Sequence, residues 1–287
     1  MNKVLIILAG SPRGGNKTWD SFIKNCKTPL NADLALCTTE KFISDNKLFQ
    51  EAKYKWISKE YDDWFDYYRN QYGNNLINYF EKGKETGLYT SGLIHFAFKD
   101  IILKNYLDIL QKYDFIVYSR FDQFYLSHPL GFDKNKIMIP KGEDYFGVCD
   151  RHTILHADYA EKFLGICKFI DSKDTLSYED EYLNCEVTFA NHLKNVGLYE
   201  KIYRYNRTQF TTALKKDETN WRIPKYKIYF YNNLMLKYPD EFLDSMRNLI
   251  KFNPNLIFKN LILILNYFYM SLRINFGRLR KELKITK

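Results

Sequence analysis

Three short, mostly apolar runs, each followed by a turn signal, constrain the fold of this chain most. They span Val4–Ala9, Ala32–Cys37 and Phe115–Ser119 in a chain of 287 residues. Runs of this kind are typical of strands in a parallel sheet that helices cover on both faces. A loop from Gly10 and a helical pattern from Thr18 separate the first run from the second. We therefore predict an α/β fold with a Rossmann-like, mixed and mostly parallel sheet flanked by helices.

Periodicity places the other elements along the chain. Strand-like runs end at Ile139 and Tyr205, and helical spacing is found over 18–26, 45–81, 91–112, 158–169 and 178–195. The pattern weakens after Arg207 and becomes helical again from Lys225. We expect one domain over residues 1–224 and a C-terminal helical extension over residues 225–287.

The basic residues concentrate at the C-terminal end. The chain has 43 Lys and Arg against 34 Asp and Glu, a net charge of +9. Residues 251–287 hold eight of the basic residues and one acid, which leaves 35 basic and 33 acidic side chains in residues 1–250. A main body so close to neutral excludes a general polyanion groove, so we expect no nucleic-acid partner. The five cysteines have no C-x-x-C spacing, which favours a reducing cytosol over a disulfide framework or zinc site.

Residues 255–287 join an apolar segment to a basic end. The longest uninterrupted apolar run, Leu261–Leu265, has five residues, far below the roughly 20 that a spanning helix needs. A helix of this kind suits an anionic membrane surface, where each Lys or Arg contributes about 1 kcal/mol. The alternative is a helix packed on the core. Val4–Ala9 is too short for a signal peptide, so we expect a cytoplasmic protein, peripheral on the inner face of the membrane.

The loop after the first predicted strand offers backbone amides and cations. A glycine loop before a helix N-terminus can bind phosphate, and the nucleotide-binding residues would be Gly10, Ser11, Arg13, Gly14 and Lys17. The loop departs from a P-loop because Asn16 separates Gly15 from Lys17. A tight turn without a ligand is the alternative.

A second candidate site follows the strand that ends at Ser119. Arg120 and Asp122 lie where ligands bind in open α/β sheets. In nucleotide-sugar transferases an acid at this place holds the Mn²⁺ or Mg²⁺ that neutralises the donor diphosphate. The usual Asp-x-Asp motif has Arg120 in place of its first acid, so either Asp122 alone binds the metal or Arg120 helps to neutralise the diphosphate. A capped strand end with a surface ion pair is the alternative.

The stretch from Glu143 to His152 carries three carboxylates, an arginine and a histidine. A sugar-transfer site needs a base for the acceptor hydroxyl and partners for sugar hydroxyls. We assign the base to Asp150, with Arg151 holding its orientation. Substrate binding is assigned to Glu143, Asp144 and His152, although a buried histidine is more often a core residue.

Another cluster of acidic residues lies at the start of the helix expected over residues 178–195. Asp180 is a catalytic candidate and Glu186 a substrate-binding candidate. Acids in a first helical turn are also favoured by the helix dipole, so a stabilising role explains them as well.

Three segments together resemble a family. Gly10-Ser-Pro-Arg-Gly-Gly with Leu30-Asn-Ala-Asp-Leu-Ala-Leu, Tyr118-Ser-Arg-Phe-Asp-Gln-Phe-Tyr, and Pro140 through His152 are similar to GT-A-type glycosyltransferases of algae, large algal viruses and bacterial surface-polysaccharide loci. The resemblance covers about residues 1–205. It implies a GT-A-like fold, a nucleotide-diphosphate sugar donor and usually a divalent ion.

In that family pattern the glycine loop lies near the nucleotide and the aspartate after the middle strand lies at the metal. These roles fall on Gly10 and Arg13 and on Asp122. The basic C-terminal end resembles the membrane-attachment ends of bacterial transferases that act on lipid-linked acceptors. The function expected is therefore a hexosyl- or deoxyhexosyl-transferase of polysaccharide biosynthesis, for lipopolysaccharide or capsule, with a glycan or glycolipid acceptor.

Two other functions fit parts of the sequence. Ser11-Pro-Arg-Gly-Gly with Thr18, and Arg120 with Ser127, resemble the phosphate-binding segments of PAPS-dependent sulfotransferases, although both spacings are imperfect. A non-enzymatic membrane-surface module would use the basic end and leave the loop and the acidic groups unexplained.

Overall fold

The computed structural model describes residues 2–85, 88–127, 131–172, 174–175, 183–217, 226–231, 234–252, 255 and 258–285. The chain forms two compact units that alternate along the sequence. Unit 1 comprises Met1–Pro12, Lys27–Phe121 and Leu130–Tyr205, and unit 2 comprises Arg13–Cys26, Asp122–Pro129 and Asn206–Lys287. The predicted boundary after residue 224 stays a prediction.

Unit 1 contains a seven-stranded sheet in the order β3-β2-β1-β4-β7-β6-β8. Its strands are β1 (Val4–Ala9), β2 (Asp33–Thr39), β3 (Tyr54–Ser58), β4 (Phe115–Ser119), β6 (Ile137–Pro140), β7 (His152–His156) and β8 (Ile202–Tyr205). β1 to β4 are mutually parallel, as are β6 and β8, whereas β7 runs antiparallel to both β4 and β6. The predicted mixed, mostly parallel α/β sheet is confirmed, and it is compatible with a Rossmann-like fold.

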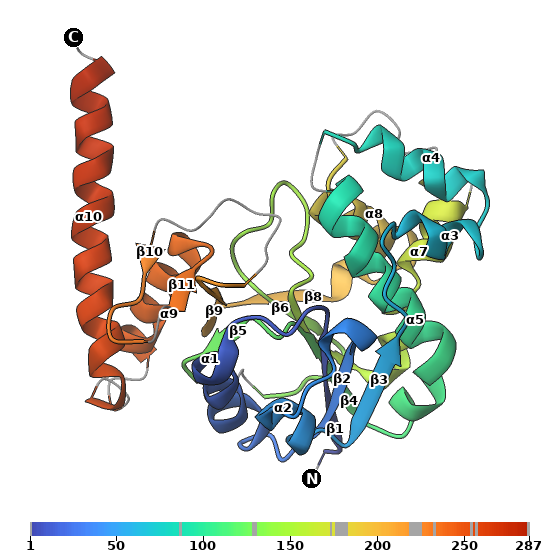
Figure 1. Cartoon of the computed structure of the whole chain (residues 1–287), viewed down its shortest axis with the longest axis horizontal. Coiled ribbons are helices and arrows are strands. Elements are labelled where there is room, and N and C mark those ends of the chain that lie inside the picture. Colours follow the sequence, from blue (N-terminus) through green and yellow to red (C-terminus); the bar gives the residue numbers. More distant parts are fainter. Residues whose placement is uncertain are drawn as a thin grey trace. The chain divides into compact units, whose positions relative to one another are not determined.

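Most of the helices of unit 1 lie near α5, whereas α2 packs on β2 (Figure 1). They are α2 (Lys47–Glu51), α3 (Phe65–Arg69), α4 (Asn74–Lys82), α5 (Leu93–Leu110), α6 (Ala160–Leu164), α7 (Ile166–Asp171) and α8 (Cys185–Asn195), and a π-helical turn at Leu88–Gly92 precedes α5. α5 packs on β1 and β2, so that buried side chains such as Phe96 and Ile102 share one core with Ile7 and Tyr118. Burial of this apolar layer stabilises the unit by about 25 cal/mol per Å² removed from water.

Unit 2 contains a four-stranded antiparallel sheet in the order β10-β11-β9-β5. Its elements are α1 (Gly15–Phe22) with a π-helical turn at Ile23–Lys27, β5 (Gln123–Tyr125), β9 (Gln209–Leu214), β10 (Tyr226–Lys227), β11 (Leu234–Leu236), α9 (Pro239–Phe252) and α10 (Leu261–Ile285). Figure 1 shows α10, in red, as the long helix beside α9. A buried ion pair between Arg207 and Glu241, 2.8 Å apart, ties β9 to α9.

Several predicted elements need correction. The first helix begins before the predicted start at Thr18, because α1 starts at Gly15 and the Thr18 hydroxyl, inside the helix, donates to the Gly14 carbonyl at 3.0 Å. The region 45–81 is not helical throughout, because it contains the strand β3, whose aromatic residues also fit a helical spacing. In β3 the Trp56 ring stacks on the ring of Tyr106 in α5, with 4.5 Å between the ring centres. β7 was also missed.

Two helical regions in the C-terminal half of the chain begin at other residues than the sequence predicts. The C-terminal extension is helical from Pro239, but two short strands, β10 and β11, precede its helices. The helix expected from residue 178 begins at Cys185, because the Asn184 side chain caps it by accepting from the Val187 amide at 2.7 Å.

Candidate functional site

The sheet of unit 1 reverses its strand order between β1 and β4. The chain continues from β1 to β2 and β3 on one side, whereas β4 lies on the other side of β1. In the register Leu8 lies opposite Ser119, so Gly10 and Arg120 follow two neighbouring strand ends. Open α/β sheets bind ligands outside the carboxyl ends of their strands at such a point. Gly10 has a φ of +110°, a backbone conformation that residues with a side chain rarely adopt.

Arg120 contacts a histidine that the sequence analysis did not single out. Its guanidinium lies 2.9 Å from Nε2 of His95 on α5, and both side chains are half-buried. Arginine can only donate, so Nε2 accepts and the ring is neutral in this arrangement. The contact orients a permanent cation at the end of β4, and a guanidinium there can pair with phosphate oxygens.

Asp150 forms an ion pair with Lys99 of α5 in the interior of unit 1. The Lys99 side chain has no exposed surface, and its ammonium lies 4.6 Å from the centre of the Tyr118 ring and 5.2 Å from that of Phe189. Burial by itself raises the pKa of Asp150, but the charges of Lys99, His95 and Arg120 and the hydrogen bond from Lys99 together outweigh it and lower the pKa to about 2. Asp150 is therefore ionised at neutral pH, and its charge is compensated.

Further charged groups face this pair. Asp150 interacts electrostatically with Arg120, and with His95 when that ring is protonated. A general base works best with a pKa near the working pH, so a carboxylate with a pKa of about 2 is a weak base. The role of Asp150 as the general base stays a prediction. The ion pair with Lys99 holds its side chain against α5. The ion-pair partner of Asp150 is Lys99, whereas Arg151 had been expected to orient it.

The segment from Gly142 to Arg151, which we call the 142–151 loop, leads from β6 to β7. Three of its residues that are not glycine have a positive φ, namely Glu143, Tyr145 and Phe146 at 58°, 43° and 71°. Such backbone costs of order 1–3 kcal/mol for each residue and persists only where surrounding contacts determine it.

Four side chains hold this loop. Arg204 of β8 donates to both carboxylate oxygens of Asp144, at 2.7 and 2.8 Å, and to the Pro140 carbonyl at 2.7 Å. Asn184 donates to the Tyr145 carbonyl at 2.8 Å. Arg151 donates to the Glu143 carbonyl at 3.3 Å and to the Cys149 sulfur at 3.1 Å, and the Tyr145 hydroxyl donates to the Glu143 carboxylate at 2.6 Å. Asp144 and Arg151 thus brace the loop, and their predicted roles in substrate binding and catalysis are untested.

His152 and Glu186 lie at the two ends of the same region. His152 begins β7 opposite Ser119, is buried, and has Nδ1 3.2 Å from the Ser119 hydroxyl. Glu186 is half-buried in the first turn of α8, where its carbonyl accepts from the Val148 amide at 3.0 Å. Both remain predicted substrate ligands, and Asp180 lies outside the described residues.

The phosphate-binding residues predicted in unit 2 already have partners there. The Gly14 amide donates to the Asp217 carboxylate at 2.9 Å, and the Leu214 amide donates to the same oxygen at 2.8 Å. The Lys17 ammonium lies 5.8 Å from the centre of the Tyr231 ring. The Arg13 carbonyl accepts from the Trp19 indole at 3.0 Å. Ser11 belongs to unit 1 and is half-buried.

Asp122, the predicted metal ligand, is buried in unit 2 before β5. Its carbonyl accepts from the Thr212 amide at 2.8 Å and from the Thr212 hydroxyl at 3.2 Å. Within the described ranges, no three His, Cys, Asp or Glu side chains form a group that could hold a metal ion. The role of Asp122 as a metal ligand stays a prediction, and no step proposed below depends on it.

Two residues of this region, His95 and Lys99, were missed from the sequence. A signal was present for the second, because Lys99 falls on the same face of α5 as the buried Phe96 and Leu103. A lysine in a buried helix stripe predicts a buried anionic partner. Nothing in the spacing indicated which carboxylate that partner is.

Comparison with known proteins adds no relative, since no protein-family model and no curated protein sequence matches the chain. None of the helices that the structure describes is both long and apolar enough to cross a membrane.

We expect Gly147→Ala to destabilise the protein. A Cβ at this position would lie 2.1 Å from backbone atoms of Glu186 and 2.3 Å from the Val187 nitrogen, so the loop would have to move off α8. Overpacking of this kind costs about 1–3 kcal/mol, which urea denaturation would measure as a lower midpoint. Gly131→Ala is the control, because its Cβ would meet nothing within 4 Å. Equal stability of the two variants would contradict the close packing.

Lys99→Met should lower the free energy of unfolding by about 3–5 kcal/mol at neutral pH, because it leaves a buried carboxylate without its counter-charge. The double variant Lys99→Met with Asp150→Asn removes both charges, so it should regain much of the loss. Urea denaturation of the three proteins measures the difference. A double variant no more stable than the single one would show that the charge of Asp150 is not the cause.

Acid should narrow the difference between the wild type and Lys99→Met. In the wild type the pKa of Asp150 falls from 3.8 to about 2, so its stabilising contribution is complete above pH 3.8 and is lost as pH falls through about 2. In the variant, burial without Lys99 raises this pKa, so the penalty disappears as the carboxyl becomes protonated. A stability difference that stays constant between pH 7 and pH 4 would contradict the ion pair.

Proposed function

We propose that the chain is a glycosyltransferase that moves a hexosyl or deoxyhexosyl group from a nucleotide-diphosphate sugar to a glycan or glycolipid. The observation that carries the proposal is the group at the carboxyl ends of β1 and β4, where Arg120 follows β4 beside His95 and near Asp150. Open α/β sheets bind nucleotides at this place. The resemblance in sequence to GT-A-type transferases points to the same chemistry.

In this proposal Arg120 binds the diphosphate of the donor. When the bond between the sugar and the diphosphate breaks, negative charge develops on the leaving group, and an oriented guanidinium stabilises that charge. His95 holds the guanidinium in place through the 2.9 Å contact. Gly10 and Ser11, at the neighbouring strand end, would lie along the same nucleotide.

The Lys99 and Asp150 pair would prepare this site. Because Lys99 balances Asp150, the carboxylate does not neutralise Arg120 completely, and the cation remains available to an anionic ligand. The base that accepts the proton of the acceptor hydroxyl is proposed among the carboxylates of the 142–151 loop and α8.

Nucleoside diphosphates should raise the melting temperature of the wild type, because a ligand at 100 times its Kd adds about 2.7 kcal/mol of stability. Arg120→Gln should reduce this shift to near zero. The matched control is Arg69→Gln, which removes an exposed arginine of unit 1 that pairs with Asp63 and Asp66. Differential scanning fluorimetry with uridine, guanosine and thymidine diphosphates provides the measurement.

Two further arms of this experiment separate the alternatives. Repeating it with Mn²⁺, Mg²⁺ or a chelator, and with Asp122→Asn, isolates any part of the shift that depends on metal. A shift with adenosine 3′,5′-bisphosphate alone would replace the proposal by a sulfotransferase. An Arg120→Gln variant that keeps the full shift would remove Arg120 from the donor site.

We also propose that the acceptor is reached at an anionic membrane surface through α10. One side of this helix packs in the core of unit 2 through Leu263, Ile264 and Met270. Large apolar side chains on its other side are exposed, namely Phe258 just before it and Leu261, Leu265, Phe268, Leu272 and Phe276 within it. They recur every three or four residues and so form one stripe.

The membrane is favoured over a second copy of the chain by the charge that follows the stripe. Residues 273–284 contain five basic side chains and one acid. In a parallel pair of helices these cations would repel each other, whereas anionic lipid attracts each of them by about 1 kcal/mol. The buried side explains why α10 also belongs to the core.

Replacing Leu272 and Phe276 by Gln should weaken binding to vesicles of phosphatidylcholine and phosphatidylserine, with little change in stability, because both side chains are exposed. Phe230→Gln, which changes an exposed phenylalanine elsewhere in unit 2, is the control. Sedimentation of vesicles at low and high salt measures the binding, and salt should weaken it. Undiminished vesicle binding would reject the surface, and loss of a dimer in its place would assign the stripe to a second copy.

A further inference from the structure

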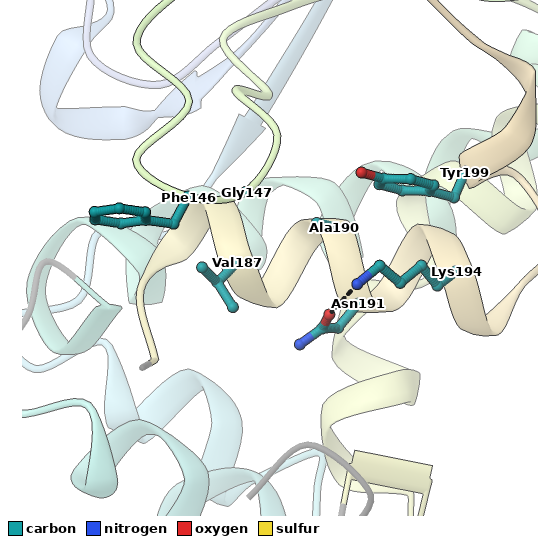
Figure 2. Close-up of a pocket in the computed structure, with 7 residues that line it drawn as sticks. All are labelled: Phe146, Gly147, Val187, Ala190, Asn191, Lys194 and Tyr199. Atoms are coloured by element: carbon teal, nitrogen blue, oxygen red, sulfur yellow. Dashed lines mark hydrogen bonds between the residues drawn. The ribbon is translucent and has the colours of Figure 1, made fainter. Parts of the chain in front are cut away.

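A pocket of about 330 Å³ lies on the outer face of α8 in unit 1. Its floor consists of Val187, Ala190, Asn191 and Lys194, which share one face of the helix through their spacing of three and four residues. Figure 2 shows the rings of Phe146 and Tyr199 at opposite ends of this face. The volume is at the lower end of the range of about 300–1,000 Å³ that is usual for small-molecule sites.

The exposed ring and the backbone conformation of Phe146 both lower the stability of the fold. Its side chain is 95% exposed and its φ is +71°, so it gives up apolar burial and adopts strained backbone at the same position. The neighbouring contacts determine this conformation, because Gly147 lies against the backbone of α8 and Asn184 holds the Tyr145 carbonyl at 2.8 Å. Strained residues held in this way cluster at ligand sites.

The polar groups of the pocket indicate the chemical class of ligand that fits it. Lys194 lies with its ammonium 5.5 Å from the centre of the Tyr199 ring and 3.3 Å from the side-chain Oδ1 of Asn191. Aromatic rings pack against the C–H faces of a pyranose, while an ammonium and a phenol hydroxyl can bond its hydroxyl or carboxylate oxygens. One lysine is too little positive charge for a nucleotide diphosphate.

We propose that this pocket binds one pyranose ring of the acceptor glycan, between Phe146 and Tyr199. The assignment of the ring to an acceptor rests on the proposed function, whereas the binding of a sugar does not. The pocket shares its framework with the group around Arg120. The 142–151 loop carries both Phe146 and Asp150, and Cys185 in the first turn of α8 interacts electrostatically with Asp150 and Lys99. An acceptor held here would therefore contact the loop that carries Asp150 and the helix whose first turn contains Cys185.

The probe is a panel of methyl pyranosides, with glucuronic acid as the anionic member, measured by saturation-transfer NMR on the full chain. We expect saturation of the sugar protons by the wild type. Phe146→Ala and Tyr199→Ala should each weaken the binding about tenfold, which corresponds to about 1.4 kcal/mol. The matched control is Phe230→Ala, because Phe230 is 80% exposed and also has a positive φ of 68°.

Folding and donor binding are checked on the same variants. Both pocket variants should keep the melting temperature of the wild type and its shift with nucleoside diphosphates. A nucleotide shift without any sugar signal, or a sugar signal that survives Phe146→Ala and Tyr199→Ala, would overturn the inference and leave the donor site in place. A sugar signal that these variants remove, in a protein that binds no nucleotide, would support the pocket and overturn the proposed function.

Discussion

The buried ion pair between Lys99 and Asp150 is the interaction on which the organisation of unit 1 depends. It joins α5 to Asp150, the last residue but one of the 142–151 loop, inside a layer of aromatic rings. Either charge alone would lower the stability of the fold, because desolvation of an isolated ion costs several kcal/mol. The pair holds Asp150 two residues before β7, whose first residue, His152, lies opposite Ser119.

The same constraint explains why a strained loop is stable. Asp150 anchors one end of the 142–151 loop, and Arg204 holds Asp144 near the other. Between them the glycine at position 147 brings the backbone against α8, which leaves the side chain of Phe146 directed outward. Strain in the loop is thus offset by one buried and one half-buried ion pair, while the Phe146 ring remains exposed.

The strands that a sequence can predict are those whose burial is local in origin. Val4–Ala9 and Phe115–Ser119 were predicted with the bounds that the structure has, because a short apolar run between turn signals has few other solutions. β3 was missed because its aromatic residues continue a helical spacing. The pairing of Lys99 with Asp150 spans 51 residues, and only the sheet order brings them together.

Part of the glycine loop already contacts a carboxylate of the protein itself. The Gly14 and Leu214 amides, which could face a phosphate, donate to one carboxylate oxygen of Asp217. A phosphate bound there would have to displace this acid, whereas the guanidinium of Arg120 contacts a neutral imidazole that competes weakly with an anion. If the chain binds a diphosphate, the larger share of the attraction should therefore come from the end of β4 and not from the glycine loop. The resemblance in sequence predicts a donor site in this region, and the electrostatics favour Arg120 over the glycine loop as the proposed phosphate ligand.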